Sequence, residues 1–130
     1  ERIHLIEPLD YETFIHVMKQ SYLIITDSGG IQEEAPSLGK PVIVVRDTTE
    51  RPEGVAAGTI KLVGTSAQAI YEECSKLLLN ASEYNRMKEI KNPFGEGDSS
   101  NKIIDIIISH FSNKINRQVY ETEIQTIVRN

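Results

Sequence analysis

The chain has 130 residues, 39% of them hydrophobic and 25% charged, and its 14 Lys and Arg against 19 Asp and Glu give a formal net charge of −5. This composition is typical of one globular domain, and the acidic balance argues against binding nucleic acid or an anionic membrane through bulk positive charge. No apolar run approaches the roughly 20 residues that cross a bilayer. A single cysteine, Cys74, excludes an internal disulfide framework, and the three histidines show no zinc-site spacing. We therefore expect a reduced, cytoplasmic setting with no metal or other cofactor, in a chain that is a piece of a longer protein.

Strand and helix signals alternate from the first residues onward. Residues 2–6 are predicted as a short strand, and Asp10 as the N-cap of an amphipathic helix over residues 11–20. An apolar strand over residues 22–25 then leads into a turn at residues 26–30.

The middle of the chain repeats this order. A short helix follows the turn and ends at Gly39, with Pro36 inside it. Residues 42–45 form a nearly continuous apolar run, typical of a strand buried on both faces of a parallel sheet. Residues 46–58 are predicted as a charged loop, and residues 59–63 as a further strand.

Helices dominate the last part of the sequence. Ser66 and Ser82 are predicted to begin two of them, and Cys74 belongs to the apolar stripe of the first, which indicates a core residue rather than a nucleophile. A second structured loop covers residues 92–98. The helix after it carries one apolar stripe, formed by Ile103, Ile104, Ile107, Ile108 and Phe111. Residues 113–130 are left as a lone helix or a loose tail without assigned function.

The spacing of these elements predicts the fold class. A dozen or more residues separate successive strands, which indicates right-handed βαβ crossovers. We therefore expect an α/β fold, with a Rossmann-like parallel sheet and helices on both faces.

The turn at Ser28, Gly29 and Gly30 is the strongest local signal for a binding site. It connects the carboxyl end of a predicted strand to a helix, where backbone N–H groups and the helix dipole favour an anion such as a phosphate. An ordinary tight turn with Ser28 as N-cap explains the same residues. Neither a Walker lysine nor a GxGxxG motif is present, so a nucleoside triphosphate and NAD are not favoured.

Two carboxylates follow in the next helix. Glu33 and Glu34 differ by about 100° around the helix axis, so at most one of them faces a ligand held by the turn, where it can accept hydrogen bonds from ribose hydroxyls. Favourable placement near the positive end of the helix explains them equally well.

The loop over residues 46–54 begins at the carboxyl end of the next strand and should reach the same edge of the sheet. Arg51 can present a forked cation to a diphosphate there, with Thr48 and Thr49 as hydroxyl donors. A solvated loop of ion pairs is the alternative. The residues supply an anionic-ligand site and no convincing acid–base pair, so no catalytic residue is assigned.

Several motifs together resemble one known family. TDSGGIQEEAP at residues 26–36, GKP at 39–41 and RDTTERPE at 46–53 are similar to the non-hydrolysing UDP-N-acetylglucosamine 2-epimerases, and the likeness extends to EPLDY at 7–11 and NPFG at 92–95. The resemblance implies two Rossmann-like domains in a GT-B arrangement. Residues 1–112 would be part of the C-terminal, UDP-binding domain.

The resemblance also implies residue roles. Ser28, Gly29 and Gly30 would bind the diphosphate, Glu34 the ribose, Phe14 would lie near the uracil, and Arg51 would complete the site. The reaction would interconvert UDP-GlcNAc and UDP-ManNAc by elimination and re-addition of UDP. Its acid and base groups would lie in the N-terminal domain, so the isolated chain should be inactive, and the full-length enzyme is expected to be a homodimer.

Three alternatives stay open at this point. A UDP-sugar glycosyltransferase of GT-B architecture, a non-catalytic UDP-sugar-binding module and the hydrolysing branch of the epimerases would all need the same nucleotide site.

Overall fold

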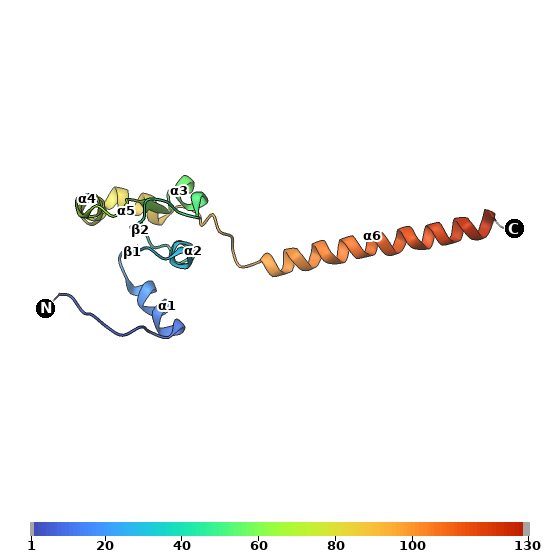
Figure 1. Ribbon diagram of the computed structural model, residues 1–130, viewed down its shortest axis with the longest axis horizontal. Helices are drawn as coiled ribbons and strands as arrows, with labels where there is room; N and C mark the ends of the chain where they lie inside the picture. Colours follow the sequence, from blue (N-terminus) through green and yellow to red (C-terminus); the bar gives the residue numbers. More distant parts are fainter. Residues whose placement is uncertain (1, 129–130) are drawn as a thin grey trace. The chain divides into compact units, whose positions relative to one another are not determined.

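The structure, a computed structural model, describes residues 2–128, with the side chains of residues 2–112 and of Lys114 (Figure 1). It divides into two units, Glu1–Phe94 and Gly95–Asn130. The first holds the sheet and the second a long helix. The expected division at residue 112 stays a prediction.

A three-stranded parallel sheet organises the first unit. Its strands are β1 (Ile24–Thr26), β2 (Val42–Val44) and β3 (Ile60–Leu62), in the order β1-β2-β3. Ile24 pairs with Val42, and Val42 pairs in turn with Ile60. All three residues of β2 are buried, as the continuous apolar run predicts.

Helices cover both faces of this sheet, which confirms the predicted α/β class. On one face, α1 (Tyr11–Gln20) and α2 (Gly29–Ser37) pack against the side chains of Val42 and Val44. On the other, α4 (Ala67–Leu79) and α5 (Ala81–Lys88) pack against Ile43. Figure 1 shows the two pairs on opposite sides of β1 and β2.

The sequence signals for helix ends are confirmed at α1 and displaced at α5. Asp10 caps α1, because its side chain accepts a hydrogen bond from the Thr13 amide at 3.0 Å. Helix α5 begins at Ala81 rather than at Ser82, since the Asn80 side chain accepts hydrogen bonds from the amides of Ser82 and Glu83.

Two predictions of secondary structure are wrong. Residues 2–6 form no strand, and Leu5 is 96% exposed, because a strand needs a neighbour to pair with and none of the described strands lies beside this segment. The predicted loop over residues 46–58 contains α3 (Pro52–Ala57). Pro52 starts this helix and Gly58, at φ +86°, ends it, so residues taken as loop punctuation are helix boundaries.

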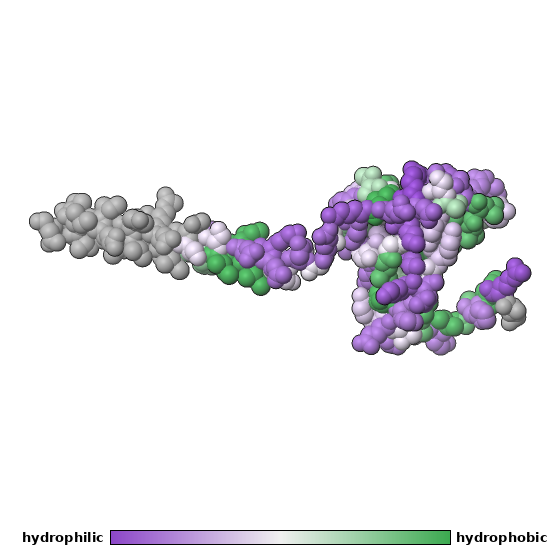
Figure 2. Space-filling view, turned by 180° about the vertical axis from the view of Figure 1, so that it is seen from behind, coloured by the Kyte–Doolittle hydropathy of each residue, from purple (hydrophilic) through white to green (hydrophobic). Residues whose placement is uncertain are grey.

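The second unit consists mainly of α6 (Ser99–Val128), which confirms a helix after the second loop and continues it through most of the tail. The five residues of the predicted stripe are all exposed, between 49% and 58%, and Figure 2 shows apolar side chains on the surface of this helix. Within residues 2–128, no helix is long and apolar enough to span a membrane. The sparse apolar side chains of residues 115–130 lie outside the description.

Candidate functional site

The turn after β1 is the core of the candidate site. Thr26 is buried at the end of β1, and its Oγ1 accepts a hydrogen bond of 3.0 Å from the Ser28 amide. Ser28 occupies the N-cap of α2 in an extended conformation, but its side chain makes no cap hydrogen bond. Its hydroxyl is therefore not committed to holding the helix end.

The two glycines that follow open α2. Neither has a positive φ, and a Cβ added to Gly29 or Gly30 would meet no atom closer than 4.0 Å. None of the described residues therefore requires glycine at these positions. The amides of Gly29, Gly30 and Ile31 have no hydrogen-bond partner among the described residues, as is usual for the first turn of a helix. Two glycines with room for a side chain therefore lie next to N–H groups without a partner among the described residues.

Gln32 is a site residue that sequence reasoning missed. It is fully buried, and its side-chain amide donates to the Ser28 carbonyl at 3.1 Å and accepts a hydrogen bond from the Thr49 hydroxyl. This side chain ties the turn after β1 to the loop after β2. The one sequence signal for Gln32 is its position one helical turn after the N-cap. Many exposed residues occupy such a position, so the signal does not predict a buried side chain.

Arg51 lies at the end of that loop, immediately before α3. Its Nε donates to the Glu33 carboxylate, its Nη1 to the Glu50 carbonyl at 3.1 Å, and its backbone amide to Thr49 Oγ1 at 3.1 Å. The remaining guanidinium donors have no partner among the described residues. The structure thus brings Arg51 against α2, as expected if the two connections after β1 and β2 lie at one edge of the sheet. The other guanidinium N–H groups stay available for a ligand.

The two carboxylates of α2 and the aromatic residue of α1 have different surroundings. Glu33 pairs with Arg51, whereas Glu34 is half-buried and has no hydrogen bond or ion pair with another described residue. Phe14 is half-buried and packs against the core cluster beneath β2. Of the two adjacent carboxylates, Glu34 is therefore the one left for a ligand.

A second ion pair lies beside the first glycine. Arg46 Nη1 donates to both carboxylate oxygens of Glu50, at 3.1 and 2.8 Å, and Glu50 Oε2 is the atom nearest to the added Cβ on Gly29. The hydrogen bonds from Arg46 hold the pKa of Glu50 below its usual value, and Glu50 raises the pKa of Arg46. Both side chains are therefore charged near neutral pH.

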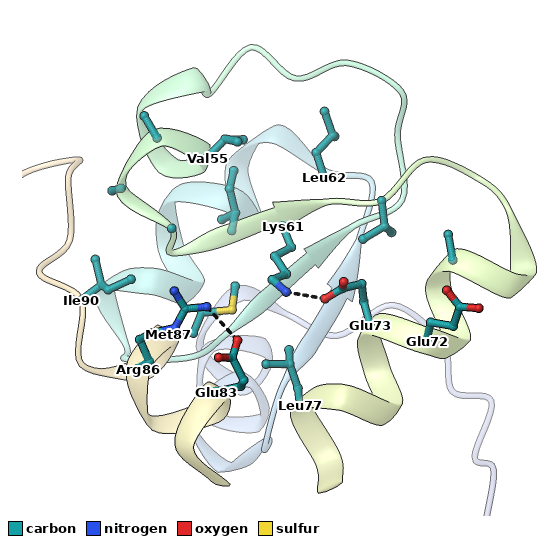
Figure 3. A pocket seen from close by; sticks show the side chains of 16 residues that line it. Val55, Lys61, Leu62, Glu72, Glu73, Leu77, Glu83, Arg86, Met87 and Ile90 are labelled. Carbon is teal, nitrogen blue, oxygen red and sulfur yellow. Dashed lines mark hydrogen bonds and ion pairs between the residues drawn. The ribbon is translucent and has the colours of Figure 1, made fainter. Parts of the chain in front are cut away.

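A well-formed cavity of the first unit lies elsewhere. A cavity of about 640 Å³ opens between β3, the end of α3, α4 and α5, and Figure 3 shows Lys61 paired with Glu73, and Arg86 with Glu83, along its wall. None of the sequence-predicted ligand residues lines it.

Cys74 is half-buried and packs against the core cluster formed by Ile43, Leu77 and Met87. Burial raises the pKa of its thiol. This agrees with its prediction as a core residue.

Known proteins are similar to this chain in sequence and in fold. The family profile described as UDP-N-acetylglucosamine 2-epimerase matches residues 1–108. The UDP-N-acetylglucosamine 2-epimerase of Bacillus subtilis (strain 168) is 52% identical over 111 residues, which are 85% of this chain and 29% of that protein. The chain therefore spans about 30% of the length of such curated relatives.

Solved structures agree with the sequence match. The Neisseria meningitidis UDP-GlcNAc 2-epimerase bound to UDP-GlcNAc superposes with a TM-score of 0.78 at 52% identity, covering 84% of this chain and 30% of that one. The S. aureus MnaA structure with UDP gives 0.80 at 50% identity, covering 85% and 30%. Sequence and fold thus agree over most of the chain, which belongs to the UDP-N-acetylglucosamine 2-epimerase family.

Proposed function

We propose that this chain is the UDP-binding part of a non-hydrolysing epimerase that interconverts UDP-GlcNAc and UDP-ManNAc. The observation that carries the proposal is the turn after β1, where a serine hydroxyl without a cap hydrogen bond, helix amides without a described partner and two unobstructed glycines lie together. Backbone amides at a helix N-terminus are suited to a phosphate. Relatives described as bound to UDP or UDP-GlcNAc support UDP as the ligand.

The proposed contacts follow the chemistry of each side chain. The turn would hold the diphosphate, the open donors of Arg51 would complete its coordination, and Glu34 would accept hydrogen bonds from the ribose hydroxyls. Phe14 would lie near the uracil. The proposed UDP-binding residues are Phe14, Ser28, Gly29, Gly30, Glu34 and Arg51.

Such a site performs one part of the reaction. Elimination of UDP from the sugar places negative charge on the departing diphosphate, and fixed amide dipoles and a cation stabilise that charge as it grows. The same contacts would retain UDP for its re-addition to carbon 1, while carbon 2 of the sugar is inverted. The chain supplies no assigned proton donor or acceptor, so the isolated chain should bind UDP but should not epimerise UDP-GlcNAc.

Further parts of the proposal concern the protein around this chain. The share of its relatives that the chain covers supports a partner domain that holds the sugar and the acid–base groups, in the two-domain GT-B arrangement. A homodimer and a cytoplasmic location belong to the same proposal. Closure of the two domains would exclude water from the unsaturated sugar intermediate, as a non-hydrolysing enzyme requires.

Calorimetric titration of the chain with UDP tests the nucleotide site. We expect binding that weakens by about tenfold or more in Ser28→Ala and in Arg51→Ala, since each substitution removes a hydrogen-bond donor to a charged ligand. Ser66→Ala is the matched control, because Ser66 also precedes a helix without a side-chain cap hydrogen bond. A folded chain that does not bind UDP, or that binds it equally well in all three variants, would contradict the proposed site.

Product analysis of the full-length protein tests the reaction class. Incubation with UDP-GlcNAc should yield UDP-ManNAc, and NMR of the sugar protons detects this product. Release of free N-acetylmannosamine would identify the hydrolysing branch instead. Transfer of the sugar to an added acceptor would identify a glycosyltransferase, and a substrate unchanged with and without acceptor would favour a binding module.

A further inference from the structure

The turn at residues 92–94 follows α5 and has no role in the proposed nucleotide contacts. The Asn92 side-chain oxygen accepts a hydrogen bond of 3.2 Å from the Phe94 amide, a local bond of the kind that fixes turns. Asn92 and Phe94 are both half-buried, whereas Pro93 is exposed. The two flanking side chains therefore point into the first unit.

Asn92 reaches the far end of α2. Its side-chain nitrogen donates to the Ser37 hydroxyl at 3.0 Å, and that hydroxyl donates to the Glu33 carbonyl at 2.9 Å, one turn back along the helix. The turn is thereby linked to the same residue whose carboxylate holds Arg51.

Phe94 reaches α3. A Cβ added to the buried Gly54 would lie 3.0 Å from Phe94 Cζ and 3.0 Å from Ile60 Cδ1, closer than side chains ordinarily approach. The backbone of α3 is thus held between the side chain of a β3 residue and the ring of Phe94. Gly54 permits this close approach because it has no side chain.

These contacts link α2 and α3 twice. On one side, Glu33 of α2 is connected through Ser37 and Asn92 to Phe94, whose ring packs against Gly54 of α3. On the other side, Arg51, which directly precedes α3, bonds to the Glu33 carboxylate. We propose that Asn92 and Phe94 are positioning residues that hold α3 against α2, and so fix the guanidinium of Arg51 beside the turn after β1.

The need for such support follows from the length of α3. A helix of six residues has little stability of its own, so its position depends on packing. Arg51 directly precedes its first residue, and a small shift of α3 therefore moves the guanidinium. Hydrogen bonds to a diphosphate weaken steeply with misalignment, so loss of the Phe94 ring should lower nucleotide affinity without removing any ligand group.

The first test rests on the proposed function and uses a double-mutant cycle on UDP affinity. Phe94→Ala should weaken UDP binding by about tenfold, and by less than about twofold when Arg51→Ala is already present, because the ring acts through that guanidinium. Tyr71→Ala, which removes an exposed aromatic ring from α4, is the control and should leave UDP affinity unchanged. An equal effect of Phe94→Ala with and without Arg51 would overturn the positioning role.

The second test needs no nucleotide and separates the two proposals. In NMR spectra of the chain, the Arg51 Nε–H that donates to Glu33 should exchange slowly with water, and at least about tenfold faster in Phe94→Ala. Asn92→Ala, which keeps the ring, should give a smaller change in the same direction and serves if Phe94→Ala fails to fold. If the chain does not bind UDP but the Arg51 Nε–H exchanges faster in the variants, the proposed function is rejected and the positioning role is supported. If the exchange rate is unaltered in both variants, the positioning role is overturned.

Discussion

The turn after β1 and the loop after β2 meet at one edge of the sheet, but they are held in opposite ways. In the turn, the Ser28 hydroxyl and the first helix amides have no partner among the described residues. In the loop, Arg46, Thr49 and Arg51 are each bonded to a neighbouring side chain. One half of the site is open, and the other, the bonded half, has its side chains paired within the loop or with α2.

This difference indicates how the site is divided between binding and support. Groups without partners can bind a ligand at no cost in broken protein contacts, whereas a paired side chain must share or exchange its partner. Arg51 does both, because its Nε is used by Glu33 while other donors of its fork are open. The bonded half therefore fixes a cation beside the helix that follows the open turn.

Loss of the bridge between the two halves should have the largest effect. Gln32→Leu removes the buried amide that joins the Ser28 carbonyl to the Thr49 hydroxyl, and leaves both without that partner. We expect the free energy of unfolding to fall by about 2 kcal/mol, measured by urea denaturation of the chain.

Gln68→Leu provides the matched control for this substitution. Gln68 is exposed on α4, and among the described residues its side chain bonds to Glu72 of the same helix and to no other, so its loss should change stability by no more than about 0.5 kcal/mol. Equal effects of the two substitutions would show that the buried bridge does not join the two halves.

A comparison of glycines sharpens the same distinction. Gly54→Ala places a methyl group 3.0 Å from two side chains, which we expect to destabilise the chain by about 1 kcal/mol after the gain in helix propensity.

Gly30→Ala has room for the added methyl group, so the free energy of unfolding should stay within about 0.5 kcal/mol. UDP affinity should fall by about tenfold, because the methyl group enters the space of the diphosphate. Thermal melts and UDP titration of both variants measure these effects. Gly30→Ala with full UDP affinity would show that the open space holds no ligand.

Local signals in the sequence predict the open half of this site better than the bonded half. The turn at Ser28 to Gly30 follows from a strand, two glycines and a helix in succession, and the cap at Asp10 follows from its own neighbours. The pairing of Arg51 with Glu33 joins residues 18 positions apart and depends on how α3 packs. No periodicity in the sequence contains that information.

The errors in secondary structure have the same origin. The apolar residues 2–6 suit a strand, but strand formation depends on a neighbour that the pattern does not specify. Pro52 and Gly58 break helices in most contexts, yet at the two ends of α3 they define one. A residue type predicts structure reliably only where its position within the element is also known.

The smallest expected effect concerns the exposed ion pair in the bonded half. Arg46 holds the pKa of Glu50 below the ordinary glutamate value of 4.5, so the pair contributes stability above that value and loses it as the pH falls through the lowered pKa. The urea midpoint of the wild-type chain should therefore decrease more, between neutral and acid pH, than that of Glu50→Gln. Arg46→Met should show the same reduced dependence as Glu50→Gln, because the hydrogen bond from Arg46 is the main cause of the shift. If Arg46→Met instead keeps the full wild-type dependence, the pair does not hold the loop in solution, and among the described contacts the loop is held by those with Gln32 and Glu33 of α2.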